Sequence, residues 1–113
     1  MNLFELTKRY VDAFGSKDID RISQLLHEDF KISDPDVSEL GPKEKAMVFI
    51  GDIFEANLDL RFSAKNIFVD GEFTIIHFNL RIGGKDYAGV DIIRWSDYKM
   101  ISLDAYLHPT VTV

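Results

Sequence analysis

The sequence contains no cysteine, which excludes disulfide bonds and thiolate metal sites. It has only three histidines, His27, His77 and His108, and none has a second ligand at metal-binding spacing. We therefore expect no metal and no cofactor. No apolar run has the length of a membrane span or the form of a signal peptide, so we expect a cytoplasmic protein with no membrane partner.

Positive charge is also scarce. Thirteen basic residues stand against nineteen acidic ones, and the formal net charge is -6. A nucleic acid or an anionic membrane surface would repel such a chain on average, so we expect no nucleic-acid partner.

Apolar and aromatic residues, by contrast, are plentiful. Hydrophobic residues make up 46% of the 113 positions and aromatic residues 12%, enough for a sizeable core or a lined pocket. We find no internal repeat and no proline-rich or glycine-rich linker. The sequence predicts one domain over residues 1–113.

Helical spacing of apolar residues recurs in three segments of the first half of the chain. The stripes are Leu3, Leu6, Tyr10, Val11 and Phe14, then Ile19, Ile22, Leu25 and Leu26, then Ala46, Met47, Ile50 and Phe54. Gly15 is expected to cap the end of the first helix and Asp18 the start of the second. Pro42 is expected to occupy the first position of the third helix.

Strands are indicated by short segments between turn residues. The stretch HEDFKISDPD, residues 27–36, alternates Phe30 and Ile32 with polar residues and ends in an acidic turn. Four more strands are expected over residues 59–69, 72–82, 85–95 and 100–108, as an antiparallel meander. Three helices followed by such a sheet predict an α+β fold.

The strand over residues 85–95 is apolar on both faces. Asp91 shares one face with Ile93 and Trp95, where a carboxylate needs a partner or a raised pKa. The alternative is that Asp91 points outward, on the face of Arg94. Val90 and Ile92 lie on the second face, which we expect to contact another subunit in a homodimer.

Several stretches resemble a known family. They are KRYVDAF, SKDIDRISQLLHEDFKISDPD, GPKEKAM, GVDIIRW and KMISLDAYL, which together extend over nearly the whole chain. The pattern resembles the SnoaL-like and ketosteroid isomerase-like branch of the NTF2-like superfamily. The resemblance implies a cone, in which a curved antiparallel sheet packs on three N-terminal helices around an apolar pocket.

The resemblance also implies roles for three residues. Asp34 matches the general base of bacterial ketosteroid isomerases, and Tyr10 and Asp91 match the donors that hydrogen-bond the dienolate oxygen. Leu26 and Phe49 stand near the places of further family tyrosines. The implied activity is that of an isomerase or cyclase acting on a small apolar carbonyl compound.

For each catalytic candidate a structural role stays open. Tyr10 could be a buried core tyrosine, Asp91 a paired carboxylate, and Asp34 a turn residue, although we assign the turn to Asp36. The whole chain could likewise be a non-catalytic binding or dimerisation module. The expected pocket residues are Phe14, Met47, Ile50, Phe54, Phe78, Leu80, Ile93, Trp95, Leu103 and Leu107.

Overall fold

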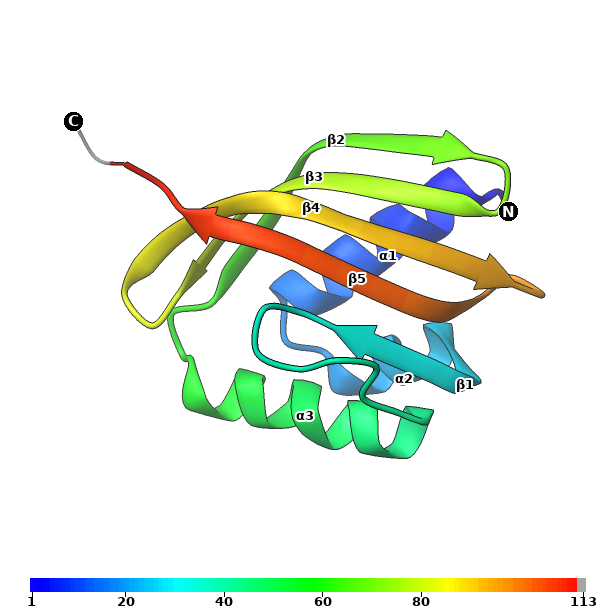
Figure 1. The fold of residues 1–113 in the computed structure, drawn as a ribbon, viewed down its shortest axis with the longest axis horizontal. Coiled ribbons are helices and arrows are strands. Elements are labelled where there is room, and N and C mark those ends of the chain that lie inside the picture. The colour runs from blue at the N-terminus through cyan, green and yellow to red at the C-terminus, as the bar shows by residue number, and fades with distance from the viewer. Residues whose placement is uncertain (112–113) are drawn as a thin grey trace.

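The computed structural model describes residues 1–111, which form three helices and one five-stranded sheet (Figure 1). In chain order these are α1 (Leu3–Gly15), α2 (Ile19–Leu25), β1 (Leu26–Ser33), α3 (Lys43–Ala56), β2 (Arg61–Asp70), β3 (Phe73–Ile82), β4 (Lys85–Ser96) and β5 (Lys99–Pro109). The predicted α+β fold is confirmed. Within residues 1–111, no helix is long and apolar enough to cross a membrane.

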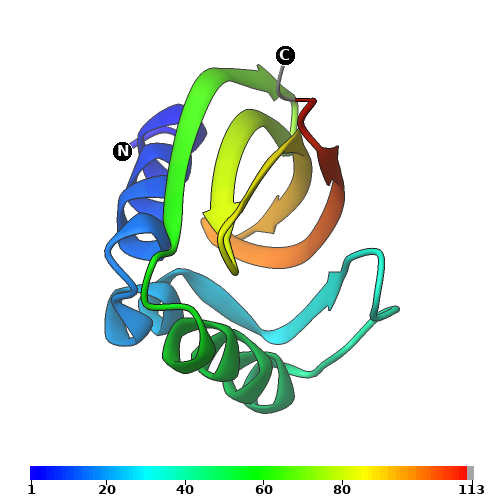
Figure 2. The ribbon, with the colours of Figure 1, turned by 90° about the vertical axis from the view of Figure 1, so that its left-hand side faces the viewer.

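The sheet has the order β1-β5-β4-β3-β2. Strands β2 to β5 form the expected antiparallel meander, whereas β1 joins the edge of β5 as a parallel strand. The sheet curls strongly around its inner face, and the helices close the open side, with α1 against β2 and α3 against β1 (Figure 2). The result is a cone.

Gly89 allows β4 and β5 to approach each other closely. A Cβ atom at Gly89 would lie 2.8 Å from the Cα of Leu107 and would also overlap the carbonyl oxygen of Tyr106. Any larger residue would push β5 away from β4, so glycine lets the two strands approach where the sheet bends.

The helix ends follow local chemistry, with three corrections. Pro42 is the N-cap of α3, and the first residue of that helix is Lys43, not Pro42. The Asp18 side chain accepts the N–H of Arg21, which confirms it as the N-cap of α2. The prediction of Leu26 in the second helix is wrong, because its extended backbone begins β1. Gly15 is not a left-handed cap either. It is the last residue of α1, and a Cβ there would approach the carbonyl oxygen of Phe62 to 3.0 Å.

The core lies between the concave face of the sheet and the helices. Ile76 and Phe78 of β3 point inward, as their alternation predicts. In β5 the expected alternation fails near its start, because a register shift beside Trp95 pairs that residue with Met100. Met100 is therefore fully buried, and the inward row of β5 starts there and not at Ile101.

Candidate functional site

A cavity of about 500 Å³ lies inside the cone, between the curved sheet, α1 and α3. Its lining is mainly apolar. Of the ten expected pocket residues, six line it: Phe14, Ile50, Phe78, Leu80, Leu103 and Leu107. A space of this size accommodates a small organic molecule.

The other four expected residues lie outside this lining. Ile93 is fully buried in the core, and Met47 and Phe54 pack in or against the core on α3. Trp95 is fixed elsewhere, because its indole N–H donates to Thr74 Oγ1 at 2.9 Å. Apolar periodicity could not separate these core positions from cavity walls, since both are buried alike.

The sequence analysis missed some lining residues. Phe62 contributes a ring between Phe14 and Phe78, with centroids 5.0 and 5.1 Å away. A register shift after Ala64 breaks the alternation of β2. The sequence therefore did not show on which face of the strand Phe62 lies. Tyr87 also lines the cavity, and its place on the same strand face as Asp91 was the available signal.

Tyr10 and Asp91 both line this cavity, although they lie in opposite halves of the sequence. Tyr10 lies on the buried stripe of α1 and is 3% exposed; Asp91 lies on β4 and is 4% exposed. Within residues 1–111 neither side chain forms a hydrogen bond to the protein, and neither polar group is sealed from the cavity. Their polar atoms are therefore available to a molecule in the cavity.

Burial governs the protonation of both groups. It raises the pKa of the Asp91 carboxyl from 3.8 to about 8, so this group is protonated at neutral pH and can donate a hydrogen bond. Burial, with a second contribution from the charge of Asp91, raises the pKa of Tyr10 well above its usual value of 10.0. The site thus presents two O–H donors.

Asp34 reaches the same cavity from the turn after β1. Its Oδ1 atom accepts the backbone N–H groups of Asp36 at 2.7 Å and Val37 at 2.9 Å. The turn residue is therefore Asp34, and the assignment of this role to Asp36 is wrong, because only the Asp34 carboxylate reaches these two N–H groups. Within residues 1–111, Oδ2 of Asp34 makes no hydrogen bond and stays available.

The carboxyl groups that line the cavity belong to Asp34, Asp36 and Asp91, of which Asp91 is protonated at neutral pH. In the described part of the chain, no lysine, arginine or histidine contributes to this lining. An anionic ligand would have no counter-charge here and would lose its hydration, so the cavity favours a neutral molecule.

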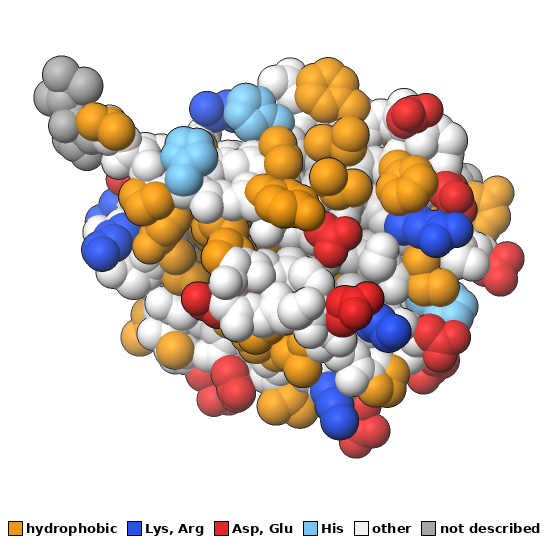
Figure 3. Space-filling model, in the orientation of Figure 1, with side chains coloured by type: hydrophobic (Ala, Val, Ile, Leu, Met, Phe, Trp, Pro, Cys, Tyr) orange, Lys and Arg blue, Asp and Glu red, His pale blue; other side chains and the backbone are white. Residues whose placement is uncertain are grey.

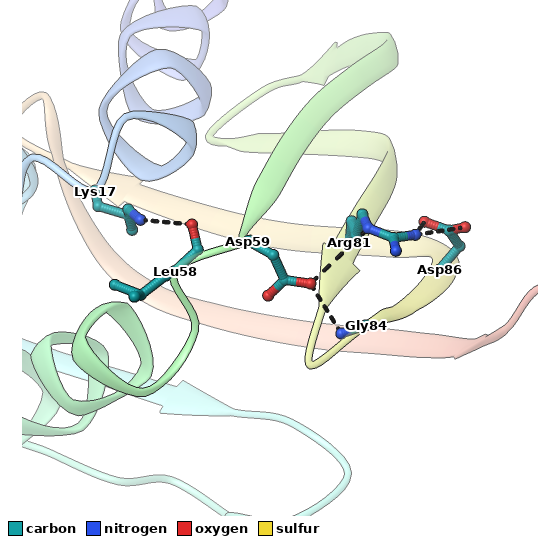
Figure 4. Close-up of polar contacts among 6 residues, drawn as sticks. All are labelled: Lys17, Leu58, Asp59, Arg81, Gly84 and Asp86. Atoms are coloured by element: carbon teal, nitrogen blue, oxygen red, sulfur yellow. Dashed lines mark hydrogen bonds and ion pairs between the residues drawn. The ribbon is translucent and has the colours of Figure 1, made fainter.

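A polar network holds the β3–β4 hairpin next to the cavity (Figure 4). Asp59, between α3 and β2, accepts the N–H of Gly84 at 2.8 Å and pairs with Arg81 at 3.8 Å. Arg81 also binds Asp86 at 3.1 Å. The hairpin therefore has a fixed position, which matters because its flanking residues Ile82 and Tyr87 line the cavity.

A curled sheet around an internal cavity, closed by three helices, defines the chain as a protein of the NTF2-like fold class. A family model for the SnoaL-like domain matches residues 7–112, and the chain belongs to this family. This confirms the resemblance. A search of curated proteins gives no match.

Solved structures share the fold at low sequence identity. An NTF2-like protein of unknown function from Cytophaga hutchinsonii superposes with a TM-score of 0.83 at 16% identity, covering 96% of this chain and 91% of that one. A candidate ketosteroid isomerase from Kribbella flavida gives 0.83 at 18%, covering 96% and 79%. An epoxide hydrolase of the LEH-like type from M. tuberculosis gives 0.80 at 13%, covering 92% and 80%. At these identities the likeness concerns the fold alone.

Proposed function

We propose that the cavity binds a small, neutral, apolar carbonyl compound and moves a proton next to its carbonyl group. The observation that carries this proposal is the pair of buried donors Tyr10 and Asp91, which have no hydrogen-bond partner within residues 1–111, in a cavity that Asp34 also lines. A protonated carboxyl and a phenol in an apolar site can both donate hydrogen bonds to the oxygen of a carbonyl group. This oxygen gains negative charge when an enolate forms.

The proton transfer needs only residues of this chain. Oδ2 of Asp34 takes a proton from the carbon beside the carbonyl, and the electron pair of that C–H bond moves to the carbonyl oxygen. Tyr10 and Asp91 donate hydrogen bonds to this oxygen and stabilise its charge. The proton on Asp34 then returns to another carbon of the conjugated system, which gives the isomer and restores the carboxylate.

The experiment is the conversion of cyclic β,γ-unsaturated ketones to their conjugated isomers, followed by ultraviolet absorbance. The informative variant is Asp34→Asn, because the Asn oxygen can still accept the two N–H groups of the turn while the base is removed. Asp36→Asn is the matched control, since it removes the same charge from the next acidic residue of the cavity lining, whose carboxylate accepts neither turn N–H group. Failure of the wild-type protein across a broad panel would refute the enzymatic proposal.

A second candidate function is ligand binding without chemistry. The observation that favours it is the use of Asp34 Oδ1 in the turn, which gives this carboxylate a structural reason to be present. On this alternative, an apolar ketone raises the melting temperature of wild-type protein and Asp34→Asn equally, and neither protein isomerises it.

We also propose that the chain forms a homodimer through the outer face of the sheet. Apolar side chains gather over the strands on this face (Figure 3). The strand register places Phe68, Ile75 and Ile92 in one row across β2, β3 and β4, and puts Val90 beside Tyr106 of β5. Phe68 and Tyr106 are more than half exposed. The row ends at Asp104 of β5, and the apolar side chains before it are suited to burial against a second copy of the chain.

Light scattering at micromolar concentration tests the dimer. Ile75→Lys should convert a dimer into a monomer, because it places a charge at the centre of the apolar row, between Phe68 and Ile92. Lys65→Ala, on the edge strand β2 but outside that row, should leave the mass unchanged. A monomeric wild-type protein would exclude this proposal.

A further inference from the structure

A second hollow, of about 510 Å³, lies outside the cone between α1, α2 and the turn that joins β4 to β5. Its floor is formed by Leu6 and Leu25, both nearly buried. Three cationic side chains stand around it: Arg9 from α1, Arg21 from α2 and Lys99 from the start of β5. It shares no lining residue with the cavity that contains Tyr10 and Asp91.

In the part of the chain that the structure describes, the three cations are not paired with carboxylates. Within residues 1–111, neither Arg9, Arg21 nor Lys99 lies within 4.0 Å of a carboxylate, whereas Arg81 and Arg94 are both paired. Three like charges around one hollow repel one another, and an anion between them would remove that repulsion.

One of the cations is held in place. The ammonium group of Lys99 donates a hydrogen bond to the backbone carbonyl of Gln24, near the end of α2. The ammonium keeps two further donors, so it can still bind an oxygen of a ligand. The guanidinium groups of Arg9 and Arg21 can each offer two parallel N–H donors to a phosphate.

The fourth feature of the rim is an aromatic ring on a strained turn. Asp97 and Tyr98 have φ angles of 51° and 61°, in the left-handed region where such turns favour glycine or asparagine. Tyr98 is 66% exposed despite its aromatic ring. Strained backbone tends to persist where it serves a function, and here the turn presents a ring beside Lys99.

The surroundings limit the size of an anion that fits. Tyr98 also borders a neighbouring hollow, which is lined by the carboxylates of Glu5, Glu72 and Asp97. A long polyanion such as a nucleic acid would extend into this acidic region and be repelled. A compact anion with one apolar or aromatic group would instead remain among the cations.

We propose that the hollow between Arg9, Arg21, Lys99 and Tyr98 binds a small organic phosphate. The phosphate group lies between the three cations, and its apolar or aromatic group packs on the Tyr98 ring and on the floor of Leu6 and Leu25. This site is independent of the cavity and of the activity proposed for it.

Phenyl phosphate is the probe, titrated into 15N-labelled protein at about 0.15 M salt and followed by NMR. We expect saturable shifts at Tyr98, Lys99 and Arg21, with weaker binding of inorganic phosphate and no saturable shifts there with phenol. Any of three results would overturn the proposal. They are shifts confined to the cavity residues, equal affinity for phenyl phosphate and inorganic phosphate, and shifts that do not saturate.

A matched pair of double variants distinguishes binding at a defined site from non-specific electrostatic attraction to the protein. Arg21→Gln with Lys99→Gln should weaken phenyl phosphate binding about tenfold or more. Lys45→Gln with Arg61→Gln makes the same change in net charge on exposed residues away from this hollow, and should change the affinity by less than about twofold. Equal losses in the two double variants would refute a defined site. Melting temperatures establish that both variants are folded.

Discussion

The hydroxyl group of Tyr10 and the carboxyl group of Asp91 belong to one electrostatic unit, because the charge of Asp91 contributes to the raised pKa of Tyr10. The two residues come from the first helix and the fourth strand, and they meet only because the sheet curls over α1. Within residues 1–111 neither side chain forms a hydrogen bond to the protein, and both line the cavity, which has space for a ligand that accepts from them. This arrangement is the basis of the proposed proton transfer.

The buried carboxyl group should make stability depend on pH. The folded pKa of Asp91, about 8, lies above its ordinary value of 3.8, so the folded protein holds this proton more tightly than the unfolded chain. The contribution of this proton to the free energy of unfolding is complete below about pH 4, and it is lost as the pH rises through about 8. Asp91→Asn removes the titration, so its stability relative to wild type should increase across this range, by on the order of 5 kcal/mol at most.

Urea unfolding of both proteins between pH 5 and pH 9 measures this difference. The contributions of the other carboxylates to the pH dependence cancel, because both proteins contain them. Stability profiles that run parallel for wild type and Asp91→Asn would contradict the buried, protonated state of Asp91.

Gly89 should be irreplaceable where the sheet bends. Gly89→Ala places a Cβ against the backbone of Tyr106 and Leu107, and should lower the free energy of unfolding by about 1–3 kcal/mol or more. Gly51 is the matched control, because a Cβ at this position in α3 meets nothing within 4 Å. Gly51→Ala should raise the free energy of unfolding by about 0.5–1 kcal/mol. Thermal or denaturant unfolding distinguishes the two, and a harmless Gly89→Ala would disprove the close approach.

Alternation and helical spacing were sufficient to predict the helices, the four-stranded meander and the inward face of β3. They failed at Leu26 and Met100, because a helix passes directly into a strand at one and a register shift moves the pairing at the other. Apolar pattern alone likewise could not tell that Phe62 faces the cavity while Ile93 lies in the core.

The site was predictable to a similar extent. Tyr10, Asp34 and Asp91 were proposed from the family resemblance, and the structure places all three on one cavity. The hydrogen bonds of Asp34 could not be foreseen, because Asp34 and Asp36 are equally suited to a turn in sequence. Only the backbone geometry decides which carboxylate accepts the N–H groups.

The hairpin next to the cavity should loosen when Asp59 is removed. Asp59→Ala deletes the acceptor of the Gly84 N–H and one partner of Arg81, so amide exchange at Gly84 should become about fivefold faster. Asp52→Ala, on the exposed side of α3, removes the same charge and should leave this exchange unchanged. Equal exchange at Gly84 in both variants would show that Asp59 does not hold the hairpin.

The central claim is that Asp34 removes a proton beside a carbonyl group whose oxygen is held by Tyr10 and Asp91. Its most direct test is the exchange of the α-protons of 1-tetralone in deuterated water, followed by NMR, since this reports enolisation whatever product forms. Wild-type protein and Asp36→Asn should accelerate the exchange over buffer, and Asp34→Asn should reduce the enzymatic rate about 100-fold or more. An exchange rate with wild-type protein no greater than in buffer, or an Asp34→Asn variant as fast as wild type, would contradict the account.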